Sequence, residues 1–301
     1  MAHHRGPTKG KPAPELPGTF TLGEILRCPP GPVDVERDFD PAATPHFPGK
    51  GKDDAPVEYA RMQPVLDGLQ ERLYAHSFTH PDSAQRVLLV LQGMDTSGKG
   101  GVIRHAIGMI NPQGVSIHAF KAPTAEELRH DFLWRVRRAL PGPGQIGIFD
   151  RSHYEDVLIG RVDHLAAPDE IEARYDRINA FEREVVAGGA RVIKCFLNVS
   201  KDAQKARLAA RLAPGGVKYW KYNPSDLASR AKWDDYMAAY GVVLERCNQD
   251  EAPWYVIPAD RKWYRNWAVA RLLAEALAGM NLTWPPADFD VEAERARVAQ
   301  S

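Results

Sequence analysis

Short apolar runs alternate with longer amphipathic segments through the middle of this chain. Residues 86–92 (RVLLVLQ) form a continuous apolar run of strand length, which is typical of a parallel strand buried on both faces. Shorter runs of similar character predict further strands at 115–120, 145–149, 191–197 and 254–257. Helices are predicted at 56–76, from Thr124 to near Pro141, from Pro168 onward, and where Val269, Leu272, Leu273 and Ala276 share one face.

This alternation predicts an α/β fold of three layers, in which a parallel five-stranded sheet lies between two layers of helices. We expect this domain to occupy residues 55–285. Residues 1–54 are rich in Pro, Gly and Asp and show no sustained periodicity, so they are predicted to form an extended N-terminal arm that wraps the domain or a partner subunit. Residues 286–301 are assigned to a C-terminal tail.

Composition narrows the range of partners. The 301 residues contain as many Lys and Arg as Asp and Glu, so any anion site must come from local clustering. No apolar run is long enough to cross a membrane, and the polar N-terminus lacks the apolar core of a secretory signal. Three scattered cysteines without a CxxC motif favour reduced thiols and a cytoplasmic location. We therefore expect no nucleic-acid partner and no membrane partner.

The motif with the clearest chemistry follows the first predicted strand. Residues 93–100 read GMDTSGKG and match the Walker A pattern GxxxxGK, placed between a strand and a helix. Its glycines let backbone N–H groups turn toward phosphate oxygens, and Lys99 adds a positive charge. Gly100 stands where this motif usually has the Ser or Thr that holds magnesium. Asp95 is the candidate replacement, because magnesium prefers carboxylate oxygens.

A second motif, IGIFDRS at 146–152, ends an apolar strand with an acidic residue, as the Walker B pattern does. Asp150 is therefore expected beside the phosphate loop, where it would hold or orient magnesium. Arg151 would face the transferring phosphoryl group and neutralise its charge. The alternative interpretation is an Asp–Arg ion pair at the surface.

A third segment, at about 205–235, is predicted to form a helical lid. Cations and aromatic residues are interleaved in it around a Gly/Pro-rich loop, and closure of such a lid over phosphates excludes water. The alternative is a solvated pair of basic helices. The cations of interest in this segment are Arg207, Arg211, Lys218 and Lys221.

Five separated motifs together resemble the polyphosphate kinase 2 family. They are GMDTSGKGG, NPQGVSIHAFKAPTAEELRHDFLWR, IGIFDRSHYEDVL, WKYNPSDLASRAKWDDY and APWYVIPADRKWYRNWAVARLL, in the order of the family. The resemblance runs from about residue 20 to residue 280 and includes LRCPPGP in the arm. It implies a thymidylate-kinase-like P-loop core with a helical lid. It also implies magnesium-dependent phosphoryl transfer between inorganic polyphosphate and nucleotides.

The resemblance also implies roles for single residues. Asp95, Lys99, Asp150, Arg151 and Arg211 become the catalytic candidates, with Asp95 and Asp150 as ligands of Mg²⁺ or of Mn²⁺ as a substitute. Polyphosphate is expected to follow a channel of cations and to meet AMP, ADP or ATP end to end. Family members are commonly cytoplasmic dimers or tetramers, so a homo-oligomer is expected. The residues expected to contact phosphate or nucleotide are Gly93, Met94, Thr96, Ser97, Gly98, Gly100, Gly101, Arg104, Lys121, Arg207, Lys218 and Lys221.

The arm and the segments FKAPT and HDFLWR are most similar to the branch that phosphorylates both AMP and ADP. In that branch an acidic residue commonly follows the loop lysine, and Asn commonly takes the position of Asp150. Here Gly100 and Asp150 occupy these positions, as if one carboxylate had moved from the loop to the strand end. Two other functions stay open. One is a conventional ATP-dependent nucleotide or nucleoside kinase, which Gly100 argues against, and the other is a non-catalytic module that binds nucleotide or polyphosphate.

Overall fold

The computed structural model describes residue 16 and residues 21–79, 81 and 85–301. Its centre is a five-stranded sheet in the order β2-β3-β1-β4-β5, with every neighbouring pair parallel. The strands are β1 Arg86–Gln92, β2 Val115–Ala119, β3 Ile146–Asp150, β4 Ala190–Asn198 and β5 Trp254–Pro258. The sequence prediction of five strands is confirmed, and each end lies within one residue of its predicted position.

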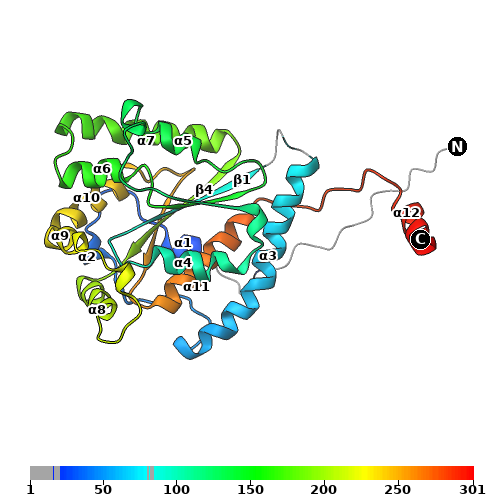
Figure 1. Ribbon diagram of the computed structural model, residues 1–301, viewed down its shortest axis with the longest axis horizontal. Helices are drawn as coiled ribbons and strands as arrows, with labels where there is room; N and C mark the ends of the chain where they lie inside the picture. The colour runs from blue at the N-terminus through cyan, green and yellow to red at the C-terminus, as the bar shows by residue number, and fades with distance from the viewer. Residues whose placement is uncertain (1–15, 17–20, 80, 82–84) are drawn as a thin grey trace.

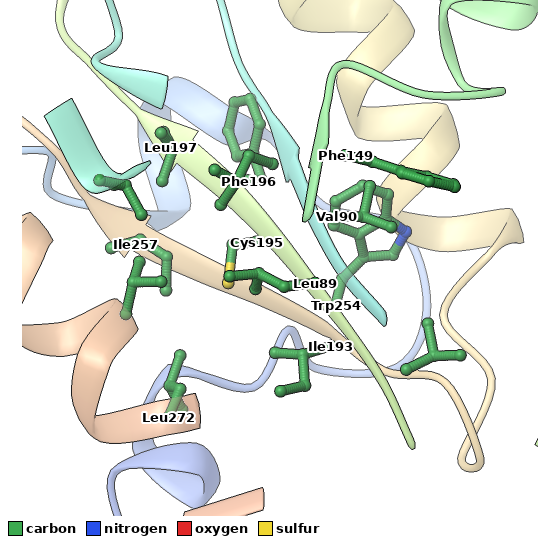
Figure 2. Close-up of a cluster of buried hydrophobic side chains, with 14 of the residues drawn as sticks. Leu89, Val90, Phe149, Ile193, Cys195, Phe196, Leu197, Trp254, Ile257 and Leu272 are labelled. Atoms are coloured by element: carbon green, nitrogen blue, oxygen red, sulfur yellow. The ribbon is translucent and has the colours of Figure 1, made fainter. Parts of the chain in front are cut away.

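The apolar runs of β1, β3, β4 and β5 are almost wholly buried because helices cover both faces of the sheet there, whereas the edge strand β2 is exposed over its second half. In β1 every residue after Arg86 is buried, and β4 is buried throughout except at Arg191. Figure 2 shows side chains from β1, β3, β4 and β5 packed into one cluster, which Leu272 joins from a covering helix. Close packing of this kind holds the strand ends in fixed positions.

Two layers of helices enclose the sheet (Figure 1). On one face α11 (Lys262–Ala278) packs against α3 (Ala55–Thr79) and α4 (Lys99–His105). On the other face α6 (Glu155–Val162) packs against α7 (Pro168–Ala187) and α10 (Trp233–Arg246). The remaining helices are α1 Leu22–Leu26, α2 Val35–Asp38, α5 Trp134–Arg138, α8 Lys201–Arg211, α9 Ser225–Ala231 and α12 Val291–Gln300, with 3-10 turns at Lys52–Asp54, Ile107–Met109, Pro112–Gly114, Glu127–Arg129 and Tyr219–Lys221.

The prediction of one helix from Thr124 to near Pro141 was wrong. The expected capping box does form, because Thr124 and Glu127 exchange side-chain bonds to each other's backbone N–H groups. It caps a single 3-10 turn, Glu127–Arg129, after which His130 is extended. Asp131 then accepts a hydrogen bond from the Leu133 N–H group, and α5 begins only at Trp134. This local side-chain bond competes with a continuous helix.

The described part of the N-terminal arm lies along the domain. Leu22 and Leu26 of α1 are buried, and α1 packs against α11 and β5. Glu275 of α11 accepts hydrogen bonds from the Leu22 and Gly23 N–H groups, both at 2.9 Å, and so caps α1 from outside. Further along, α2 packs against α10.

Two further features of the described residues concern membrane-spanning helices and cysteines. None of their helices combines the length and the apolar character that a membrane span needs. Cys28, Cys195 and Cys247 are free thiols and are all buried. Burial raises the pKa of the Cys28 thiol to about 11, so this group stays protonated near neutral pH.

Replacing Glu275 by Ala should destabilise the protein by about 1–3 kcal/mol, because two N–H groups of α1 lose a charged acceptor. The free energy of unfolding, measured by urea titration, tests this. Glu294→Ala is the control, since Glu294 forms an exposed ion pair with Arg297 in α12. We expect it to change stability by less than about 0.5 kcal/mol. Equal effects of the two substitutions would contradict the proposed capping of α1.

Candidate active site

The phosphate loop joins β1 to α4 at the carboxyl edge of the sheet. Gly93, Thr96 and Gly98 adopt positive φ angles of 146°, 63° and 112°. A Cβ atom on Gly93 would lie 2.8 Å from the Leu197 carbonyl oxygen, so the close approach of β4 requires glycine there. Left-handed backbone of this kind directs successive N–H groups inward and forms a concave anion site.

Lys99 begins α4, and its side chain folds back over the loop. Its ammonium group donates a hydrogen bond to the Gly93 carbonyl oxygen at 2.7 Å. Burial lowers the pKa of Lys99 and the charge of Arg151 lowers it further, while Asp150 and Asp95 raise it. A phosphate bound in the loop would add negative charge beside the ammonium group and favour its charged form.

The end of β3 places Asp150 and Arg151 next to the loop. In the register of the sheet Asp150 lies opposite Leu91, near the end of β1. Arg151 has a φ angle of 64°, which is costly for a residue with a side chain. Its Nη2 donates to Asp95 Oδ1 at 2.9 Å, and its Nη1 lies 3.9 Å from Glu155 Oε2. Arg151 therefore pairs with a carboxylate of the phosphate loop.

A buried network fixes the turn that follows Arg151. Glu182 of α7 accepts hydrogen bonds from Lys194 of β4 at 2.5 Å and from the Tyr154 hydroxyl at 2.7 Å. Its Oε1 also lies 3.2 Å from Nε2 of His153, and all four side chains are almost completely buried. Burial alone would raise the pKa of Glu182, but the Lys194 ammonium holds it below the usual value. The network thus anchors the turn to α7 and β4.

A cavity of about 650 Å³ opens beside the loop. Residues of α4, α8 and the first turn of α11 border it, at the carboxyl ends of the strands where parallel sheets usually bind ligands. Among the described residues of its lining, the carboxylates are Asp95 and Asp150. The cations are Lys99, Arg104, Lys121, Arg151, Arg207, Arg211, Lys218, Lys221, Lys262 and Arg265. Such an excess of positive charge fits a ligand with many negative charges.

The structure brings most of the expected site residues together. All cations predicted for the site line this cavity, and so do both predicted metal ligands. Gly93 and Met94 instead line a second cavity of about 230 Å³, which shares Asp95 and Arg151 with the first. Ser97 is completely buried and borders neither of these two cavities. Of the expected residues between positions 93 and 101, those on the larger cavity are Asp95, Thr96, Gly98, Lys99, Gly100 and Gly101.

Two arginines predicted to contact phosphate are bonded to protein groups in this structure. Arg211 Nη1 donates to the Lys221 carbonyl oxygen at 2.7 Å and to Asp226 Oδ2 at 3.1 Å, which joins α8 to the 3-10 turn and to α9. Arg207 donates four hydrogen bonds to backbone carbonyl oxygens, two of them in the phosphate loop. Both side chains still border the cavity.

Sequence reasoning missed Lys262 and Arg265, which extend the cation lining from α11. Burial lowers the pKa of Lys262, and the nearby cations Arg207, Arg265 and Lys218 lower it further. The sequence did contain a signal that would place them at the site. Both residues follow shortly after a parallel strand and lie three positions apart on one helix face. Lys194 was also missed. A lysine inside the apolar run RVIKCFL indicates a buried acidic partner.

Comparison with protein-family models matches residues 51–284 to Polyphosphate kinase 2 (PPK2). The chain belongs to the polyphosphate kinase 2 family. A solved polyphosphate kinase 2 from Arthrobacter aurescens TC1 superposes with a TM-score of 0.88 at 48% identity, over 94% of this chain and 98% of that one. The expected three-layer P-loop kinase fold is thereby confirmed.

Curated polyphosphate phosphotransferases are similar over most of their length. An AMP/ADP-polyphosphate phosphotransferase of Meiothermus ruber is 42% identical over 257 residues, which cover 85% of this chain and 93% of the relative. An ADP-polyphosphate phosphotransferase of Rhodopseudomonas palustris is 41% identical, with 73% of this chain and 78% of the relative covered. The polyphosphate kinase 2 family thus includes relatives that differ in the nucleotide they are named for.

Replacing Glu182 by Gln should destabilise the protein by about 3–5 kcal/mol, because the Lys194 ammonium would be left buried without a carboxylate. Urea unfolding measures the change. Glu184→Gln is the matched control on the same helix, since Glu184 forms an exposed ion pair with Arg137. We expect that control to cost less than about 1 kcal/mol. A cost for Glu182→Gln as small as that of the control would refute the anchoring role of the network.

Proposed function

We propose that this protein transfers a phosphoryl group between inorganic polyphosphate and nucleoside mono- or diphosphates, with AMP and ADP as acceptors. The observation that carries the proposal is the cation-lined cavity around the phosphate loop. A linear polyanion needs a row of positive charges, and the lining supplies one from five separate segments of the chain. The names of the relatives, which include AMP/ADP-polyphosphate and ADP-polyphosphate phosphotransferases, support it.

The reaction requires positioning and charge neutralisation more than proton transfer. Phosphoryl transfer passes through a loose transition state whose charge is spread over the equatorial oxygens. Lys99 and Arg151 place positive charge on the cavity wall, and the bond to Asp95 fixes the direction of Arg151. The attacking phosphate oxygen of AMP or ADP is already anionic, so a strong general base is not needed. Arg211 would join these groups by exchanging its protein acceptors for phosphate oxygens when the lid of about 205–235 closes.

Asp95 and Asp150 are the carboxylates that we propose to hold Mg²⁺, with Mn²⁺ as a substitute. The donor set fits the ion, because magnesium is commonly bound by one or two carboxylates while substrate phosphates and water complete its shell. Both side chains line the cavity that Lys99 borders. Bound Mg²⁺ would neutralise phosphate charge during transfer. Gly100 has no hydroxyl group that could bind Mg²⁺, so the two carboxylates would be its protein ligands.

We place the polyphosphate chain along Arg104, Lys121, Lys218 and Lys221, which lie on the cavity wall together. Lys218 and Lys221 are exposed and belong to the loop after α8, so they can follow a flexible chain of phosphates. The expectation of a homodimer or homotetramer remains a prediction. Light scattering coupled to size-exclusion chromatography would test it.

Purified protein with Mg²⁺ and long-chain polyphosphate should convert ADP to ATP, and AMP to ADP, without added ATP. Lys99→Ala should lower the rate at least about a hundredfold, because the loop loses the charge that stabilises the transferring group. Chromatographic separation of the nucleotides measures both reactions. Lys205→Ala is the control, since Lys205 lies exposed on α8 and does not line the cavity.

The same assay separates the alternatives. Turnover that appears only with ATP as the donor would replace the proposal by a conventional nucleotide kinase. Binding of polyphosphate without turnover of AMP or ADP would favour a non-catalytic module. Product from ADP but not from AMP would restrict the acceptor to diphosphates.

The KM for polyphosphate should rise with salt, because raising ionic strength from about 0.1 to 1 M shortens the screening length from about 10 to 3 Å. The double variant Lys218→Ala/Lys221→Ala should raise the KM about fivefold at low salt and reduce its dependence on salt, at roughly 0.5 kcal/mol per exposed contact. Steady-state kinetics at several salt concentrations measure both effects, with Lys205→Ala again as the control. A KM that does not change with salt would exclude this channel.

A further inference from the structure

The outer face of the phosphate loop is held by side chains of two helices. A loop that turns its N–H groups inward must turn its carbonyl groups outward, where they need donors. Three consecutive carbonyls of this loop find such donors in α8 and α11. Gln204 Nε2 donates to the Asp95 oxygen at 3.1 Å, Arg207 Nη1 to the Thr96 and Ser97 oxygens at 2.9 and 3.1 Å, and Arg265 Nη1 to the Ser97 oxygen at 2.9 Å.

Arg265 lies directly against the glycine backbone of the loop. A Cβ atom on Gly98 would lie 1.7 Å from its Nη1, and one on Gly101 would lie 2.5 Å from its Nη2. The guanidinium group therefore occupies the space that side chains at these positions would fill. Asn266 fixes its plane, because Asn266 Oδ1 accepts from both Nε at 3.1 Å and Nη2 at 2.7 Å.

Arg207 ties the same loop to the end of β5. While its Nη1 binds the loop, its Nη2 donates to the Ala259 and Asp260 carbonyl oxygens at 2.5 and 3.0 Å. All five N–H bonds of a guanidinium group lie in one plane, so one arginine can join two backbone segments with a fixed geometry. A lysine ammonium has no such plane.

The two guanidinium groups lie close enough to repel each other. Burial is the main cause that lowers the pKa of Arg265, and the charge of Arg207 adds to it, so that together they bring the pKa to about 10. Arg265 is only 3% exposed. Arg207 is half-buried beside it. Two cations this close and this poorly solvated are costly, and their hydrogen bonds to loop carbonyls offset part of that cost.

We infer that Arg265 is a positioning residue for the phosphate loop. Together with Arg207 it holds the loop carbonyls outward, so that the N–H groups already converge on the phosphate position before polyphosphate binds. The inference deepens the proposed function and rests on it. It assigns Arg207 to the support of the loop, where the sequence had suggested direct contact with phosphate.

Arg265→Lys tests whether the guanidinium plane or the positive charge matters. Binding of tripolyphosphate, measured by calorimetry, should weaken at least about tenfold, because lysine keeps the charge but loses the paired hydrogen bonds. The kcat for ADP should fall as well, since a misplaced loop also misplaces the transferring group. Wild-type affinity and wild-type kcat in this variant would overturn the inference.

Arg271→Lys is the matched control on the same helix. Arg271 is as deeply buried as Arg265 and donates to Glu275 at 2.6 Å, far from the loop in the chain. We expect Arg271→Lys to lower the midpoint of thermal unfolding while it leaves tripolyphosphate affinity and kcat unchanged. Equal losses of affinity in both variants would reduce Arg265 to a general structural role and overturn the inference.

Chemical rescue supplies a second readout. In Arg265→Ala, millimolar guanidinium chloride should restore part of the tripolyphosphate affinity, and an equal concentration of sodium chloride should not. Absence of rescue in a folded variant would count against a positioning role. Because binding is measured without turnover, a wild-type protein that binds tripolyphosphate but does not phosphorylate AMP or ADP would refute the proposed function and leave the inference standing. A wild type that fails to bind tripolyphosphate would refute both.

Discussion

Parallel pairing at the centre of the sheet determines where the residues of the candidate active site lie. Because β1, β3 and β4 all end at one edge, the segments that follow them meet there directly. Asp95 and Arg151 are 56 positions apart in the chain and still form an ion pair. A shift of the β1–β3 register by a single residue would turn Asp150 to the opposite face of the sheet and separate it from the loop. The apolar contacts of Figure 2 therefore maintain the geometry of the candidate active site as well as the stability of the fold.

The same edge concentrates positive charge in a chain whose formal net charge is zero. Since the totals are equal, acidic residues must outnumber Lys and Arg in the rest of the chain. Some of them form ion pairs there, such as Glu182 with Lys194 inside the protein and Glu184 with Arg137 on its surface. Local clustering thus creates an attractive field for a polyanion without giving the whole molecule a basic surface. The cations of this cluster differ in what they bind. Lys99 faces the cavity over the loop, whereas Arg207 donates hydrogen bonds to backbone carbonyl groups.

Much of this arrangement could be predicted from the sequence, because its signals are local. The five strands are short apolar runs, and the phosphate loop follows the first of them in a recognisable pattern. The helix expected from Thr124 failed because Asp131 makes a local bond that interrupts it. Arg265 and Lys194 could not be assigned roles, since their partners lie far away in the chain. The hydrogen bonds of Arg207 could not be predicted either. The spacing along a lid helix identifies a cation, but it does not show which oxygen atoms that cation will bind.

The arm has a consequence for the behaviour of the protein in solution. Cys28 donates its N–H group to the Trp254 carbonyl oxygen at 2.8 Å, and Arg27 forms an antiparallel bridge with Tyr255. These contacts place the arm at the outer edge of β5, where the backbone would otherwise be open to a strand from another molecule. An open edge strand of an apolar sheet is a template for aggregation. The N-terminal segment therefore covers part of the edge of β5 and hinders a strand of another molecule from pairing there.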